Sequence, residues 1–150
     1  MRIYHMAQED NFRYIVRVAN TDLDGEKTIL QALRKIRGVS FMMANALCVV
    51  TKMNPQTKAG TLSDEQLQQL QHALLNPQES RIPSWLYNRR KDYETGADMH
   101  VSVNDLFIVQ EDDVKRLKKV RAYRGIRHAN KLPSRGQRTK SNFRKNKGKR

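Results

Sequence analysis

Four residues near the start of the chain have the types and spacing of a calcium-binding loop. Asn20, Asp22, Asp24 and Gly25 stand at the first, third, fifth and sixth positions of such a loop, where oxygen ligands and a turn-forming glycine are needed. The twelfth position, which should supply a bidentate glutamate, is Gln31, and no helix pattern precedes Asn20. We therefore interpret the segment as a turn that leads into a helix, without a bound metal.

Other residues capable of metal or covalent chemistry are scattered along the chain. The histidines are His5, His72, His100 and His128, and none has a cysteine partner or a repeated short spacing, as a metal site would require. The single Cys48 excludes an internal disulfide and a multi-cysteine zinc site, and it favours a reducing compartment or a protein that is indifferent to redox conditions. No serine, cysteine or carboxylate has the sequence setting of a recognised nucleophile. We expect no cofactor and no enzymatic activity.

Basic side chains dominate the end of the chain. Of the 29 Lys and Arg residues, 16 lie between Lys115 and Arg150, a segment with no Asp or Glu, while the net charge of the whole chain is +14. The few apolar side chains in this segment cannot offset the entropy lost on ordering it. Gly, Pro, Asn and Ser interrupt any amphipathic face suited to a membrane surface. The pattern favours nucleic acid as the ordering partner, and a solvated, mobile tail is the alternative.

The residue types in this segment suit contact with folded RNA. Arginines can make bidentate contacts with phosphates, Gln137 and Thr139 add neutral hydrogen bonds, and Gly125 and Gly136 allow a close approach of the backbone. His128 can stack on a base or contact a phosphate.

Two helices separated by a tight turn form a second candidate site. Apolar spacing predicts helices at about 27–36 and 41–52, and the sequence IRGVS lies between them. The turn Gly38, Val39 and Ser40 could present free backbone N–H groups to an anion, as in a helix-hairpin-helix motif. An ordinary corner within a protein core explains the same pattern equally well.

The remaining elements position these candidates. Alternation over 12–18 predicts a strand that ends at the turn-rich segment ANTDLDGEK. Ser63 and Gln66 form a capping box for a third helix, with Leu62 and Leu67 as its hydrophobic staple. A final helix is expected at about 103–121. Residues 76–100 read as an ordered loop around Trp85 and Leu86, and its residues Trp85, Tyr87, Arg89 and Arg90 could contact RNA or pack against the helices.

The length of 150 residues fits one domain with an arm. We expect a mainly helical domain at 1–122 with an insertion at about 76–100, followed by an extended basic tail at 123–150. The longest apolar run, Phe41 to Val50, is too short to span a membrane, and the first residues lack a signal-peptide core. We expect a soluble chain that is not exported.

Three segments of the chain carry a resemblance to a known family. They are the basic motif YRGIRHANKLPSRGQRTKSN at residues 123–142, residues 15–48, which begin IVRVANTDLDGEK, and the segment IPSWLYNRRKDYETGADMH. The first is similar to the basic signature of the universal small-subunit ribosomal protein family numbered thirteen. The second resembles the amino-terminal part of that family, and the third is similar to an insertion found in its archaeal and eukaryotic branch.

The resemblance implies a structural protein in the head of the cytoplasmic small ribosomal subunit, with a helix-two-turn-helix domain, a long helix and an extended tail. Its partners would be small-subunit ribosomal RNA, transfer RNA, the neighbouring small-subunit protein nineteen and large-subunit components at an intersubunit bridge. Ribosomal RNA would contact Arg124, Gly125, Arg127, His128, Arg135, Gly136, Gln137, Arg138 and Thr139. The part facing transfer RNA would comprise Lys140, Arg144, Lys145, Lys147, Lys149 and Arg150.

Two other classes of protein compete with this interpretation. A helix-two-turn-helix DNA glycosylase grips a phosphate backbone with a similar corner, but such enzymes use an amino-terminal proline and commonly a zinc finger, whereas this chain begins Met-Arg and has one cysteine. A general basic chromatin or RNA-coating protein is compatible with the composition, although the long segment around Trp85 does not favour it.

Overall fold

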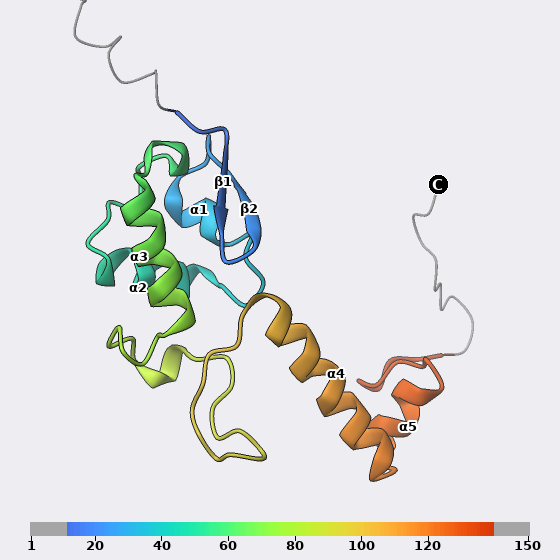
Figure 1. The fold of residues 1–150 in the computed structure, drawn as a ribbon. Helices are drawn as coiled ribbons and strands as arrows, with labels where there is room; N and C mark the ends of the chain where they lie inside the picture. Colours follow the sequence, from blue (N-terminus) through green and yellow to red (C-terminus); the bar gives the residue numbers. More distant parts are fainter. Residues whose placement is uncertain (1–11, 140–150) are drawn as a thin grey trace, which may run out of the picture. The chain divides into compact units, whose positions relative to one another are not determined.

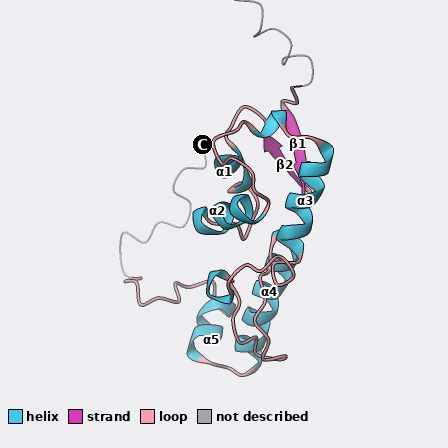
Figure 2. Cartoon of the chain, turned by 90° about the vertical axis from the view of Figure 1, so that its left-hand side faces the viewer, coloured by secondary structure: helices cyan, strands magenta, loops and turns pink. Residues whose placement is uncertain are grey.

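The computed structural model describes residues 12–139. In this range the chain forms, in order, β1 (Ile15–Val18), β2 (Thr21–Asp24), α1 (Ile29–Leu33), α2 (Phe41–Val50), η1 (Ala59–Thr61), α3 (Asp64–Leu75), η2 (Ser84–Leu86), α4 (Val103–Lys119) and α5 (Tyr123–Ala129), where η marks a 3-10 turn. The expected mainly helical class is confirmed, as the prevalence of helix in Figure 2 makes clear. The chain separates into two compact units between Leu106 and Phe107; the functional boundary after residue 122 stays a prediction.

The first unit begins with a β-hairpin, of which only the first strand was predicted. β1 and β2 pair antiparallel with Val18 opposite Thr21, so Ala19 and Asn20 form a two-residue turn. Both have positive φ, 45° and 58°, which is the type I′ geometry that matches strand twist. The expectation that the whole segment after Val18 is a turn was therefore wrong, because pairing with β1 extends the chain and buries Leu23 in the core.

Helices α1, α2 and α3 pack with the hairpin around one apolar core, and Figure 1 shows them gathered about the two strands. α1 is shorter than expected, since Lys35 and Ile36 donate to the carbonyls of Ala32 and Leu33 in tighter turns at 3.0 Å. The capping box is confirmed: Ser63 Oγ accepts from Gln66 N at 3.3 Å, and Gln66 Oε1 accepts from Ser63 N at 3.1 Å. The largest fully buried side chains are Val16, Val18, Ile29, Leu33, Ile36, Met43, Leu47, Cys48, Leu70 and Leu74.

α4 contains no buried residue. Charge interactions along the helix contribute to its stability. Asp105 lies in its first turn and Arg116, Lys118 and Lys119 in its last, an order that complements the helix dipole. Lys115 Nζ contacts Asp112 Oδ1 at 2.9 Å, and Arg116 Nη2 contacts Asp113 Oδ1 at 3.5 Å, which adds i,i+3 support. Within residues 12–139 no helix is sufficiently long and apolar to cross a membrane.

The segment between α3 and α4 is ordered around Tyr87 rather than around Trp85. Tyr87 is 8% exposed and its hydroxyl donates to Ile82 O at 3.0 Å, whereas Trp85 is 62% exposed. The expectation that Trp85 organises this loop was therefore wrong, because the short turn η2 directs the tyrosine, two residues later, into the core.

Residues 88–101 double back on themselves, and we call them the finger; in Figure 1 it is the narrow yellow loop that precedes α4. At its base the Asn88 side chain donates to Val101 O at 2.6 Å and accepts from Val101 N at 2.9 Å. Arg89 and Met99 then exchange two backbone hydrogen bonds, at 3.2 and 2.8 Å. The finger is thus closed at its base by the Asn88–Val101 hydrogen bonds and one antiparallel β-bridge.

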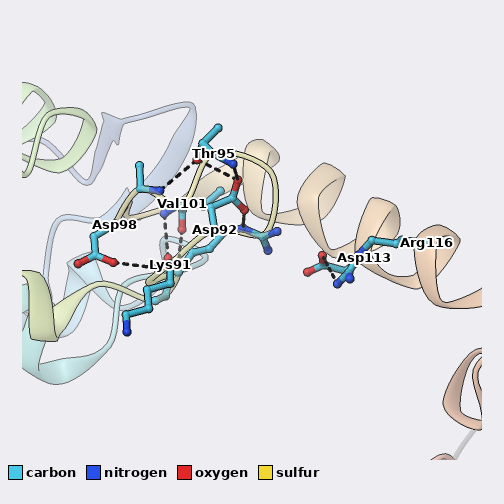
Figure 3. Close-up of polar contacts among 10 residues, drawn as sticks. Lys91, Asp92, Thr95, Asp98, Val101, Asp113 and Arg116 are labelled. Carbon is cyan, nitrogen blue, oxygen red and sulfur yellow. Dashed lines mark hydrogen bonds and ion pairs between the residues drawn. The ribbon is translucent and has the colours of Figure 1, made fainter.

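Asp92 holds the tip of the finger (Figure 3). Its carboxylate accepts from Arg89 Nε, from Thr95 N at 3.3 Å and from Thr95 Oγ1 at 3.1 Å. These donors, led by the Arg89 hydrogen bond, lower the pKa of Asp92 to about 2. Hydrogen bonds to the charged form favour that form, so the tip depends on an ionised carboxylate.

The finger should therefore loosen in acid. Because the pKa of Asp92 is lowered in the folded chain, its contribution to stability is complete above the pKa of about 4 that an unfolded aspartate has. That contribution is lost as pH falls towards 2. The Thr95 amide signal in NMR spectra should titrate with a midpoint near 2, and Asp92→Asn should remove the titration. A midpoint near 4 would contradict the role of Asp92.

Candidate nucleic-acid interface

The second unit presents basic side chains on a backbone that doubles back after α4. Arg121, two residues beyond the end of α4, has φ 56°. Ala122 N donates to Leu117 O at 3.2 Å, and Arg121 N donates to Lys118 O at 3.1 Å. This pair of bonds is a Schellman ending, which satisfies carbonyls at a helix end and reverses the chain. The usual glycine is replaced here by an arginine.

α5 occupies the first seven residues of the segment expected to be extended. The backbone of α5 lies very close to that of α4: a Cβ on Gly125 would lie 2.2 Å from Leu117 O. Gly125 is buried, so this contact excludes any side chain and lets α5 lie against α4. Gly125 was predicted to let the backbone approach RNA, but the approach it makes in this structure is to α4.

A second Schellman ending follows α5. Lys131 has φ 53°, Leu132 N donates to Arg127 O at 2.9 Å, and Lys131 N donates to His128 O at 3.2 Å. The Arg127 side chain closes the same loop, because its Nε donates to Pro133 O at 2.9 Å. Arg127 therefore helps to build the loop that carries the residues after it.

The predicted RNA-contacting residues thus divide into two groups. Gly125, Arg127 and Gln137 take part in the chain's own structure; Gln137 Oε1 accepts from Arg135 N at 3.2 Å. Six others are exposed: Arg124, His128, Arg135, Gly136, Arg138 and Thr139. Arg124 and His128 are four residues apart on α5, so they share a face of the helix. Lys140, Arg144, Lys145, Lys147, Lys149 and Arg150 lie outside the described residues.

The electrostatics of this unit change sign at Asp113. The last acidic residues, Asp112 and Asp113, pair with Lys115 and Arg116, and Figure 3 shows the second pair. The hydrogen bond to Asp112 raises the pKa of Lys115. No Asp or Glu follows Asp113 in the sequence. Residues 115–139 contain ten cations, and the eight that come after Lys115 and Arg116 have no compensating acidic side chain. Such a surface suits a polyanion.

Sequence reasoning missed three contributors to this surface. Arg121 and Lys131 hold left-handed positions where glycine is expected, and only the apolar residue that follows each of them could have signalled a Schellman ending. Tyr123, which is 74% exposed beside Arg124, offers an aromatic ring to the same surface.

The turn at residues 38–40 has a packing explanation. Gly38 has φ 95°, and a Cβ there would lie 2.7 Å from Val101 O, so glycine is needed where the base of the finger crosses the turn. Val39 N donates to Ile36 O at 3.1 Å, and Ser40 Oγ accepts from Met43 N at 3.5 Å. One of the three backbone donors is thus already used, and anion binding by Gly38 and Ser40 stays a prediction.

Metal chemistry gains no support from the described residues. Asp22 and Asp24 lie on β2, and Asp24 pairs with Lys27 at 3.1 Å. Its carboxylate also accepts from Glu26 N at 3.1 Å. Across residues 12–139 no group of three His, Cys, Asp or Glu side chains could hold an ion.

Comparison with known proteins identifies similar chains. Residues 17–145 match the model of a family described as ribosomal protein S13/S18. The small ribosomal subunit protein uS13 of Methanocaldococcus jannaschii is 49% identical over 138 residues, covering 92% of each chain. The uS13 proteins of Methanopyrus kandleri and Nanoarchaeum equitans are 49% and 50% identical over 139 and 131 residues. These alignments cover 91% and 87% of this chain, and 92% and 86% of the relatives.

Replacing Gly125 should separate α5 from α4. Gly125→Ala places a methyl group where Leu117 O lies 2.2 Å away, and an overpacked site typically costs about 1–3 kcal/mol. Hydrogen exchange at the Ala122 and Ile126 amides, which bond to Leu117 and Ala122, should accelerate. Arg124→Ala, at an exposed position of the same helix, is the control and should leave exchange unchanged. Equal exchange in both variants would refute the packing role.

Proposed function

Since the chain belongs to the ribosomal protein S13/S18 family, we propose that it is a structural constituent of the small ribosomal subunit that binds ribosomal RNA through its second unit. The family membership confirms the resemblance seen in residues 123–142. The archaeal uS13 relatives cover about nine-tenths of this chain, so the proposal concerns the whole chain. No catalytic step is part of it.

One observation carries the RNA-binding proposal: beyond the Lys115–Asp112 and Arg116–Asp113 pairs, the eight cations between Leu117 and Thr139 are followed by no Asp or Glu, yet the backbone that carries them is fixed. The two Schellman endings and the Arg127–Pro133 hydrogen bond hold the loop. Arg135 and Arg138 extend from it and are exposed. Phosphates would supply the missing negative charge, and release of their counterions would drive binding.

α5 contributes a second row of contacts in this proposal. Arg124 and His128 share one face, and the exposed Tyr123 ring lies next to Arg124 in the sequence. Arginine binds phosphate oxygens with two parallel hydrogen bonds, while tyrosine and histidine rings can stack on unpaired bases. Gly125 and Arg127 act in our proposal by holding α5 and the following loop in place.

The proposal extends to the wider assembly. We place the protein in the head of the cytoplasmic small subunit, beside small-subunit protein nineteen, with a contribution to an intersubunit bridge. The residues from Lys140 to Arg150, which lie outside the described range, would run towards transfer RNA with six cations. No feature of the described residues favours a DNA glycosylase or a general RNA-coating protein over this proposal.

Removing two arginines from the loop should reduce the salt dependence of RNA binding. Arg135→Ala/Arg138→Ala would eliminate two phosphate contacts, and the slope of log affinity against log salt should fall by about 1.5. The measurement is filter binding of the full chain to a transcript of the head domain of an archaeal small-subunit ribosomal RNA, at several salt concentrations.

The matched control removes the same charge elsewhere. Arg17→Ala/Lys35→Ala deletes two exposed cations from the first unit and should change the slope much less. Equal slopes for the two double variants would mean that binding reflects net charge alone, and the assignment of the loop would fail.

A chain that ends at Thr139 tests the transfer RNA proposal separately. In reconstituted subunits this truncation should retain the protein, because the loop residues are intact, while weakening transfer RNA binding through loss of six cations. Transfer RNA affinity equal to that of subunits with the full chain would contradict the proposed path of the tail.

A further inference from the structure

The finger at residues 88–101 has no role in the function proposed above. It belongs to the first unit, and its base is tied by the Asn88–Val101 hydrogen bonds. A loop that serves only to connect α3 with α4 needs no such hydrogen bonds across it. Loops that are both ordered and projecting are frequent binding elements.

Both aspartates of the finger accept hydrogen bonds from donors within the finger (Figure 3). Asp92 accepts from Arg89 and Thr95, and Asp98 Oδ1 accepts from Lys91 N at 2.8 Å. Asp92 is also bonded through its backbone to Ala97 O at 3.0 Å. Two of the three acidic residues between Asn88 and Val101 therefore serve as internal acceptors.

The cations and the aromatic ring of the finger lie at its surface. Arg90 and Lys91 are exposed, and Tyr93 is 71% exposed at the tip. Glu94 is the remaining acidic residue and is exposed as well. An exposed aromatic ring two and three residues after two exposed cations suits a single-stranded RNA contact, where the ring stacks on a base and the cations meet nearby phosphates.

The rigidity of the tip adds to this argument. Gly96 N donates to Asp92 O at 2.8 Å and Thr95 N donates to the Asp92 carboxylate, so the residues on both sides of Tyr93 are fixed before any partner arrives. A tyrosine has only two side-chain torsions to immobilise, and pre-organised loops lose little entropy on binding. The buried core of a protein–protein interface is more apolar than its rim, whereas Tyr93 is the only large apolar side chain of residues 89–98.

We propose that the finger is a second RNA contact of this protein, in which Tyr93 stacks on an unpaired base and Arg90 and Lys91 bind the flanking phosphates. The identity of the RNA as small-subunit ribosomal RNA rests on the proposed function. The contact itself is separate from α5 and the loop at 131–139, since it lies in the other unit of the chain.

Three variants of the full chain test the contact with the head-domain transcript. Tyr93→Leu keeps an apolar side chain but removes the stacking surface, and should weaken binding roughly 5- to 100-fold. Tyr93→Phe keeps the ring and should bind within about twofold of the native chain. Arg90→Ala/Lys91→Ala should lower the salt slope by about 1.5, against little change for the Arg17→Ala/Lys35→Ala control.

Folding of the finger is checked in the same samples. The Thr95 amide signal reports whether the Asp92 network survives, and it should be unchanged because the Tyr93 side chain is mostly exposed. If Tyr93→Leu alters that signal, its affinity is set aside. The salt slope of Arg90→Ala/Lys91→Ala is then compared with that of Tyr93→Phe, and this difference in slope decides the question, provided that both variants keep the Thr95 signal.

The outcomes separate this proposal from the one before it. Native affinity for Tyr93→Leu together with a control-like slope for Arg90→Ala/Lys91→Ala would overturn the finger contact, while a loss in Arg135→Ala/Arg138→Ala would still support the loop. Losses in the finger variants alone would support the finger and refute the loop. An effect of the finger variants that appears only after another ribosomal protein is added would identify a protein partner and overturn the proposal.

Discussion

The constraint on which this protein depends is the absence of a carboxylate after Asp113. Ten cations lie in residues 115–139, and only Lys115 and Arg116 have acidic partners, one turn earlier on α4. The chain therefore fixes the backbone by means that need no charge pairing: two Schellman endings, the contact of Gly125 with Leu117, and the Arg127–Pro133 hydrogen bond. Contacts within the chain fix the backbone of this segment, and a bound polyanion would compensate its positive charge.

The first unit uses its acidic residues in the opposite way. Residues 1–114 contain all 15 carboxylates and 13 cations, and several carboxylates support local structure rather than ligand binding. Asp24 stabilises the turn after β2, and Asp92 stabilises the tip of the finger. Asp98 accepts a hydrogen bond from the backbone of Lys91 across the finger. Because these acids are satisfied internally, the nearby cations Arg90 and Lys91 stay available at the surface, as the arginines of the second unit do.

Basic residues also occupy positions that usually favour glycine. Lys52, Arg81, Lys91, Arg121 and Lys131 all have φ between 51° and 56°, a conformation that costs a side-chain-bearing residue free energy. Three of them, Lys52, Arg121 and Lys131, each lie two residues beyond the end of a helix, where a positive charge interacts favourably with the helix dipole. A glycine would relax the backbone but would remove a cation from the surface. The chain keeps the charge in places where the structure alone would not require it.

The sequence by itself determined the elements whose signals are local. Apolar periodicity predicted the helical class, and the capping box at Ser63 and Gln66 predicted the third helix. The run of cations without an Asp or Glu after Asp113 indicated a polyanion-binding end. These signals are readable because propensity and net charge depend on neighbouring residues only. Tertiary structure decided what depends on contacts distant in sequence. β2 forms because β1 lies beside it, Tyr87 rather than Trp85 enters the core, and Gly38 and Gly125 are needed because Val101 and Leu117 approach them. Such approaches leave no pattern in the local sequence, since either glycine could equally have served a flexible turn.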